Sequence, residues 1–79
     1  MKKVGQIMEF NGRFGLITGE KEDFNFHASD FSNSNFITSI ETGDIVEFRA
    51  EYRPYNIKRA KNIKILQKMY IKNSKEIDK

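Results

Sequence analysis

Residues 10–17 read Phe-Asn-Gly-Arg-Phe-Gly-Leu-Ile, and they decide how the first half of the chain folds. Within them, Asn11-Gly12 is the strongest short-range signal for a β-hairpin turn. Val4 to Phe10 before the turn and Arg13 to Thr18 after it alternate apolar and polar side chains, as half-buried strands do. The sequence therefore predicts two antiparallel strands joined by a tight turn.

Two registers of this hairpin remain open from the sequence. With a two-residue loop, the opposed pairs are Phe10–Arg13 and Ile7–Leu16. With a three-residue loop, they are Phe10–Phe14, Met8–Leu16 and Ile7–Ile17. A shift of one residue exchanges the faces of one strand relative to the other. We prefer the longer loop because it puts the two isoleucines together on the core side.

Three further segments have the pattern of strands. They are Phe24 to His27, Asp44 to Tyr52 and Ile57 to Leu66. Polar turns separate them, and Pro54 lies in the break before the last one. Alternation along these strands puts four large side chains on the inner face. These predicted core residues are Phe24, Phe26, Val46 and Phe48.

The segment from Ala28 to Ser39 is rich in serine and asparagine, which predicts a long loop. We expect one helical turn near Asp30, with Phe31 and either Phe36 or Ile37 packing the loop against the core. Residues 1–66 then form one domain, and residues 67–79 form a C-terminal extension or tail. Spacings of three to four between apolar residues from Ile65 to Tyr70 fit a short helix or a longer fifth strand equally well.

The composition limits the classes of protein to which the chain can belong. The chain has 79 residues, of which 38% are hydrophobic and 32% charged, so it is expected to be one small globular domain. It has no cysteine, which excludes disulfides, thiol nucleophiles and cysteine-based zinc sites, and favours a cytoplasmic location. We expect no signal peptide and no membrane span. The net charge of +3 is a mild bias toward polyanionic partners.

Five motifs occur in order along residues 4–66. They are Gly5-x-Ile7-x-x-Phe10-Asn11, Arg13-Phe14-Gly15-Leu16-Ile17, Phe24-Asn25-Phe26-His27-x-Ser29, Glu41-x-Gly43-Asp44-x-Val46-x-Phe48 and Ala60-Lys61-Asn62-Ile63. The second and third resemble the two RNA-binding motifs of bacterial cold-shock domains, and the series as a whole is similar to that family. The resemblance implies an all-β fold, a five-stranded OB-fold β-barrel, to which the spacing of the last apolar residues adds a short C-terminal helix or extension.

Members of that family bind single-stranded RNA and DNA by stacking bases on aromatic side chains of the first three strands. Phe14 and His27 match stacking positions, and Phe10 matches a further aromatic position. The predicted nucleic-acid-binding residues are Phe10, Asn11, Arg13, Phe14, Leu16, His27, Tyr55, Lys58 and Arg59. The stacking face is thinned, however. Glu9 stands where the family has tryptophan, Leu16 and Asn25 stand where it has phenylalanine, and Ala28 stands where an aromatic residue is common.

The basic residues of the fifth strand have two readings. Arg59 lies in a cluster with Lys58, Lys61 and Lys64, and Arg53 and Tyr55 come just before it. Lysines on a strand edge protect against edge-to-edge aggregation. The same side chains supply phosphate contacts, which give affinity without sequence information and a strong dependence on salt.

A second function also remains open, from a different class. Met8, Phe10, Phe14 and Leu16 would form one exposed apolar face if they share a side of the sheet, and such a face fits a protein partner or self-association. We expect no enzyme, since His27 is the only histidine and no carboxylate pair or phosphate-binding loop accompanies it. We expect neither a cofactor nor a metal.

Overall fold

The computed structural model of the chain describes residues 2–32 and 40–68. These residues form five strands and one 3₁₀ turn: β1 (Lys2–Phe10), β2 (Phe14–Thr18), β3 (Asp23–His27), η1 (Ala28–Asp30), β4 (Ile45–Arg53) and β5 (Ile57–Gln67). The five predicted strands are confirmed, with ends close to where the alternation placed them. The predicted helical turn near Asp30 is η1.

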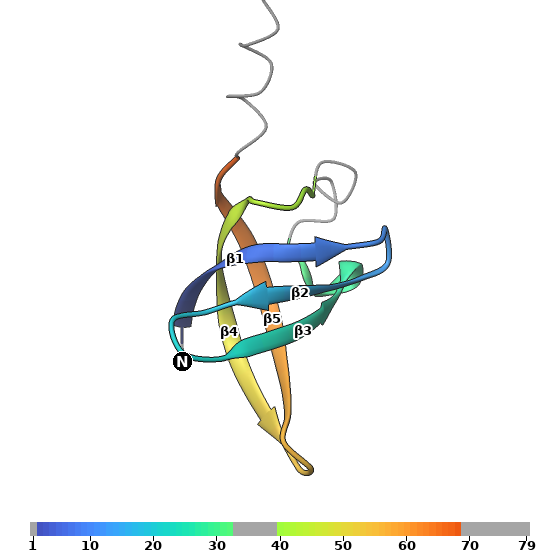
Figure 1. Ribbon diagram of the computed structural model, residues 1–79, viewed down its shortest axis with the longest axis vertical. Coiled ribbons are helices and arrows are strands. Elements are labelled where there is room, and N and C mark those ends of the chain that lie inside the picture. The colour runs from blue at the N-terminus through green and yellow to red at the C-terminus, as the bar shows by residue number, and fades with distance from the viewer. Residues whose placement is uncertain (1, 33–39, 69–79) are drawn as a thin grey trace, which may run out of the picture.

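The sheet closes on itself in the order β1-β2-β3-β5-β4. Neighbouring strands are antiparallel except β3 and β5, which are parallel and meet where Asn25 lies opposite Arg59. Strands β1 to β3 cross over the long β4–β5 hairpin, whose tip projects beyond them (Figure 1). The molecule is therefore mostly β, as the sequence predicts.

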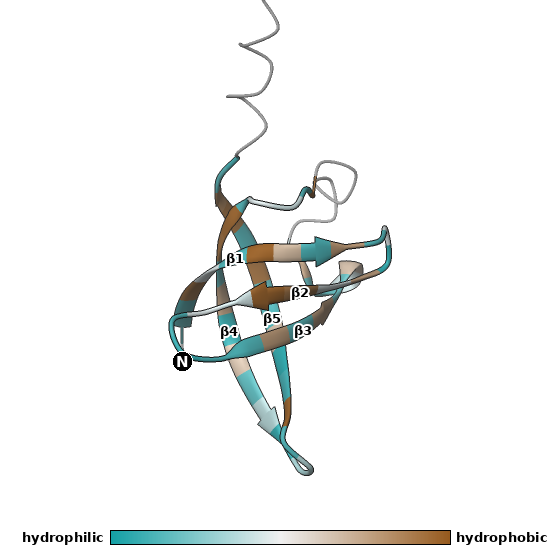
Figure 2. Cartoon of the chain, viewed as in Figure 1, coloured by the Kyte–Doolittle hydropathy of each residue, from teal (hydrophilic) through white to brown (hydrophobic). Residues whose placement is uncertain are grey.

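The core lies inside this closed sheet. Apolar and polar residues alternate along the strands as brown and teal bands (Figure 2), so each strand buries one face. Phe24 and Phe48 pack with ring centroids 5.0 Å apart. Among the described residues, the fully buried apolar side chains are Ile7, Ile17, Phe24, Phe26, Val46, Phe48, Ala60 and Ile63. The four predicted core residues are confirmed.

The predicted register of the first hairpin is correct at one end and wrong at the other. Ile7 lies opposite Ile17, as the three-residue loop requires. Beyond it a β-bulge at Met8 shifts the pairing, so that Glu9 lies opposite Leu16 and Phe10 lies opposite Gly15. The predicted pairs Phe10–Phe14 and Met8–Leu16 are not formed.

The bulge follows from the spacing of the two large apolar residues of β1. Ile7 and Phe10 are three positions apart, and strict alternation would send them to opposite faces. One extra residue lets both face inward. Phe10 then packs on Phe26 with ring centroids 5.7 Å apart and an interplanar angle of 16°. Gly15 opposite Phe10 leaves room for the Phe26 ring, because any Cβ there would collide with that ring.

The loop after β3 begins as predicted. Phe31 is buried, packs against Phe26 with ring centroids 5.8 Å apart, and forms an isolated parallel bridge with Ile63. Phe36 and Ile37, the other predicted anchors of this loop, lie outside the described residues. The predicted C-terminal helix or extension also lies outside them from residue 69 onward. Within the described part, β5 continues to Gln67.

Candidate functional site

Four of the outward-facing side chains of β2 and β3 form a surface that we call the outer β2–β3 face: Phe14, Leu16, Asn25 and His27. Their neighbours Ile17, Phe24 and Phe26 point into the core, so alternation turns these four outward. Phe14 lies opposite His27, and Leu16 lies opposite Asn25. The face therefore consists of two rows. One row is aromatic, and the other pairs an apolar side chain with a polar one.

The aromatic row is formed by an exposed pair of rings. Phe14 is 55% exposed. Its ring meets the His27 imidazole edge to face, with centroids 4.8 Å apart and an interplanar angle of 74°. The Arg13 guanidinium carbon lies 5.8 Å from the centroid of the Phe14 ring, within cation–π range. An aromatic surface and a positive charge are thus brought together at one end of β2.

The orientation of His27 is fixed by the turn that follows it. Its Nδ1 accepts a hydrogen bond from the Ser29 amide at 3.0 Å and lies 2.8 Å from the Ser29 Oγ. Because a backbone amide only donates, Nδ1 carries no proton here, and the proton of the neutral ring is on Nε2. His27 is thus both the N-cap of η1 and a side chain of the outer β2–β3 face.

The loop between β1 and β2 is held by Asn11. Its side-chain oxygen accepts hydrogen bonds from the backbone amides of Arg13 and Phe14, both at 2.9 Å. The backbone amide of Asn11 donates to the Phe14 carbonyl at 3.1 Å. Asn11 was predicted as a binding residue. Its side-chain oxygen is engaged in positioning Arg13 and Phe14, so it supports the site from within the loop.

Next to the outer β2–β3 face, the Asp30 carboxylate forms ion pairs with two cations of β5. The carboxylate accepts from the Lys61 ammonium at 2.9 Å, from the Arg59 guanidinium at 3.3 Å and from the His27 amide at 2.8 Å. Burial raises the pKa of Asp30. The His27 amide, Lys61 and Arg59 outweigh that effect, so the pKa lies below its ordinary value of 3.8. Arg59, predicted to bind phosphate, is therefore tied to a buried carboxylate.

Asp30→Asn is expected to lower the free energy of unfolding by about 1–3 kcal/mol at neutral pH, because it leaves Lys61 and Arg59 without their anion. The depressed pKa means that the folded chain binds fewer protons at Asp30 than the unfolded chain does. The stabilisation is therefore present above pH 3.8 and lost as the pH falls through the folded pKa.

Urea unfolding from neutral pH to about pH 2 measures this loss. The stability gap between wild type and Asp30→Asn should close in acid. Asp23→Asn, an exposed aspartate on β3, serves as the control and should show a small gap throughout. A gap that is the same at every pH would contradict this assignment.

The remaining predicted basic and aromatic residues lie elsewhere. Lys58 pairs with Glu22 at 3.3 Å. Tyr55 is 92% exposed and has a positive φ of 67° in the turn between β4 and β5. That turn is the projecting hairpin tip, far from the end of the sheet where β2 begins and β3 ends (Figure 1). The structure does not bring Tyr55 to the outer β2–β3 face.

The apolar face expected for a protein partner is not formed as predicted. Phe10 is half-buried, lies opposite Gly15 and packs on Phe26 against the core, so it faces the other side of the sheet from Phe14. Leu16 is half-buried and lies between two polar neighbours, Glu9 on β1 and Asn25 on β3. The cause is the bulge at Met8, which turns Phe10 inward and puts Glu9 in the outer row. The resemblance to cold-shock domains already put Glu9 at a stacking position, whereas strict alternation did not, although the odd spacing of Ile7 and Phe10 signals it.

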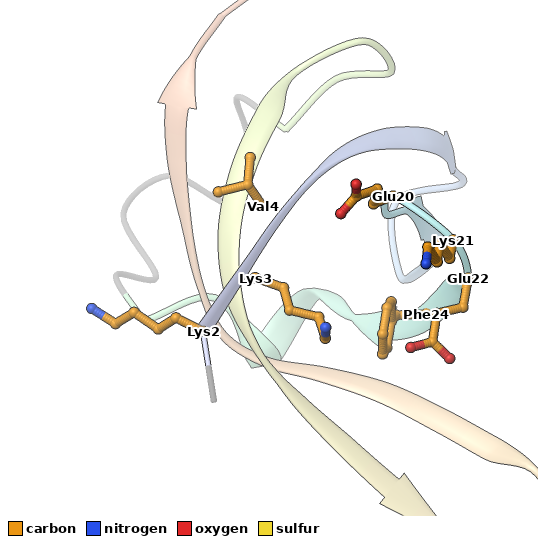
Figure 3. A pocket seen from close by; sticks show the side chains of 7 residues that line it. All are labelled: Lys2, Lys3, Val4, Glu20, Lys21, Glu22 and Phe24. Atoms are coloured by element: carbon orange, nitrogen blue, oxygen red, sulfur yellow. The ribbon is translucent and has the colours of Figure 1, made fainter.

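A separate hollow of about 330 Å³ lies between the start of β1 and the β2–β3 turn. Figure 3 shows Lys3 reaching from β1 on one side, with Glu20, Lys21 and Phe24 on the other. At its edge Glu22 accepts a hydrogen bond from the Tyr52 hydroxyl at 2.7 Å. That bond is the main reason why the pKa of Glu22 lies below its ordinary value. Burial opposes it, and Lys58 and Lys3 lower the pKa further. Charges of both signs line this hollow.

Within residues 2–32 and 40–68, no three histidine or acidic side chains are grouped so as to hold a metal ion. No helix in this part of the chain is long and apolar enough to cross a membrane. In comparisons with known proteins, no family model and no curated protein matches the chain.

Proposed function

We propose that this chain is a divergent member of the cold-shock domain family, with an OB-fold barrel, that binds single-stranded RNA or DNA in the cytoplasm without catalysing a reaction. The observation that carries the proposal is the exposed Phe14–His27 ring pair with Arg13 beside it. The five motifs that resemble those of the family support the OB-fold part of the proposal. The closed order of five strands with one parallel pair is consistent with it.

In this proposal a base stacks on Phe14 and is bordered by the His27 ring. Stacking on an aromatic side chain contributes about 1–3 kcal/mol per base and tolerates any base, because every base has a π-face. Arg13 meets the adjoining phosphate. Leu16 offers a half-buried apolar contact next to the rings. One or two nucleotides are therefore bound closely, which fits a short site and modest affinity.

The ion pairs of β5 change the expected salt dependence. Lys58, Arg59 and Lys61 are already paired with Glu22 or Asp30. Few cations are then available to replace counterions on the phosphates. For single strands, log affinity falls with log salt by about 0.7 for each phosphate neutralised. With one or two phosphates at Arg13 and its surroundings, we expect a slope of about −1, shallower than the basic cluster alone implies.

Fluorescence anisotropy titrations with short U-rich, dT-rich and mixed single strands test the proposal, at low and at physiological salt. The expected result is saturable binding with the shallow slope given above, and NMR shifts of the backbone amides near Phe14 and His27. A matched double-stranded oligonucleotide should bind more weakly, because its bases are not free to stack. Absence of binding to all strands at low salt would overturn the proposal.

The alternative of a protein-binding module is less well supported. Its premise was one apolar surface formed by Met8, Phe10, Phe14 and Leu16, and Phe10 lies inside the sheet. The outer row also carries the polar residues Glu9 and Asn25. If the oligonucleotides fail to bind, the self-association state measured by analytical ultracentrifugation is the next observation to make.

A further inference from the structure

We propose that Glu9 and Asn25 read the edge of the base stacked on Phe14, and that the site consequently prefers cytosine to uracil. This inference rests on the proposed nucleic-acid function and adds a specificity to it. Its starting point is the bulge at Met8, which brings Glu9 into the outer row of the sheet.

The register places the two polar residues on either side of Leu16. Glu9 on β1 lies opposite Leu16 on β2, and Leu16 lies opposite Asn25 on β3. This row runs parallel to the aromatic row of Phe14 and His27. The two rows are two residues apart along each strand. Two residues of a strand span about 6.8 Å. A base that stacks on Phe14 with its edge toward β1 and β3 of this row is therefore within reach of Glu9 and Asn25.

Both polar side chains are available for a ligand. Glu9 and Asn25 are exposed. Other strand glutamates are occupied, since Glu47 pairs with Lys2 at 2.9 Å and Glu51 with Arg53 at 2.8 Å. Within the described ranges, Glu9 makes no such ion pair. An unpaired carboxylate beside a stacking ring is unfavourable for phosphate, so its place in a nucleic-acid site is explained by contact with a base.

The chemistry of a carboxylate selects among bases. An ionised glutamate only accepts hydrogen bonds. Cytosine presents an N4 amino group, which donates to a carboxylate, and this is a recognised pairing of glutamate with a base edge. Uracil presents a carbonyl oxygen at the same position and is repelled. The Asn25 amide donates to the O2 carbonyl that both pyrimidines share, so it orients either base and does not choose between them.

Oligo-C and oligo-U RNAs of equal length provide the test, at neutral pH and fixed salt. Cytosine and uracil differ at position 4 and in protonation at N3. Neither carries the methyl group of thymine, so the comparison isolates the hydrogen-bonding edge. The expected result is that the wild type binds oligo-C about five- to tenfold more tightly than oligo-U, the lower end of what one base contact supplies. Glu9→Gln should bring the ratio close to one, because an amide both donates and accepts.

The control is Glu20→Gln, which removes the same charge from an exposed position in the β2–β3 turn. It should keep the preference for oligo-C while changing affinity for both RNAs alike. Asn25→Ala should weaken both RNAs and leave their ratio unchanged. Equal binding of the two RNAs by the wild type, or a preference retained in Glu9→Gln, would overturn the inference and leave the proposed function standing. Failure of both RNAs to bind would instead overturn the proposed function.

Discussion

Gly15→Ala is expected to lower the free energy of unfolding by about 3 kcal/mol, at the upper end of what overpacking a core costs. A Cβ at this position would lie 2.5 Å from the Glu9 carbonyl oxygen and against the tip of the Phe26 ring. The carbonyl cannot move without opening the β1–β2 pairing, and Phe26 cannot move without losing its stack on Phe10. In a domain of this size the melting temperature should fall by about 12–24 °C.

Gly12→Ala is the matched control for this prediction. A Cβ at Gly12 would meet nothing within 4 Å, but the residue has a positive φ of 100°. Its cost is therefore backbone strain alone, about 1–2 kcal/mol. Thermal and urea unfolding followed by circular dichroism would compare the two variants. If Gly15→Ala proves no more destabilising than Gly12→Ala, the close packing of β1 and β2 at Gly15 is wrong.

Phe14→Ala is expected to weaken binding of a single-stranded oligonucleotide by about 5- to 150-fold, the loss of one stacked base. The side chain is 55% exposed and its ring meets that of His27 at the surface, so the fold should be retained. Phe14→Ala combined with His27→Ala removes the whole aromatic row and should reduce affinity further. Fluorescence anisotropy measures the loss, and circular dichroism checks the fold.

Two comparison variants make the result specific. Phe14→Tyr keeps the ring and should bind within about threefold of the wild type, as the stacking surface is preserved. Tyr55→Ala removes a more exposed aromatic residue at the hairpin tip and should leave affinity nearly unchanged. If binding survives the Phe14 and His27 double substitution, the site lies elsewhere. A large loss in Tyr55→Ala would place it on the β4–β5 hairpin.

Most of the fold was predictable because alternation is a local property of the sequence. The phenylalanines of residues 24–26 and the apolar positions of residues 45–50 repeat every second residue, and the structure buries them as that pattern requires. Asn11-Gly12 marked the first turn, and its position is correct. The register beyond Ile7 was not predictable by strict alternation, because a bulge adds one residue to one strand only.

The candidate site was predicted in part. Phe14 and His27 were placed on one outer face and lie side by side there. Arg59 and Lys58 were grouped with them because of their charge, yet each is paired with a carboxylate from a distant part of the chain. The sequence shows how many cationic side chains are present. Whether each one is available to bind phosphate depends on which anions the fold places next to it.

The sequence by itself determined the strands, the first turn and the residues of the core, since each follows from the order of apolar and polar side chains along a few neighbouring positions. Only the tertiary structure decided that Phe10 faces inward and that Asp30 holds Arg59 and Lys61. Both outcomes depend on partners from other strands. The Phe10 ring gains a stack on Phe26, and the buried Asp30 carboxylate requires cations to offset its desolvation.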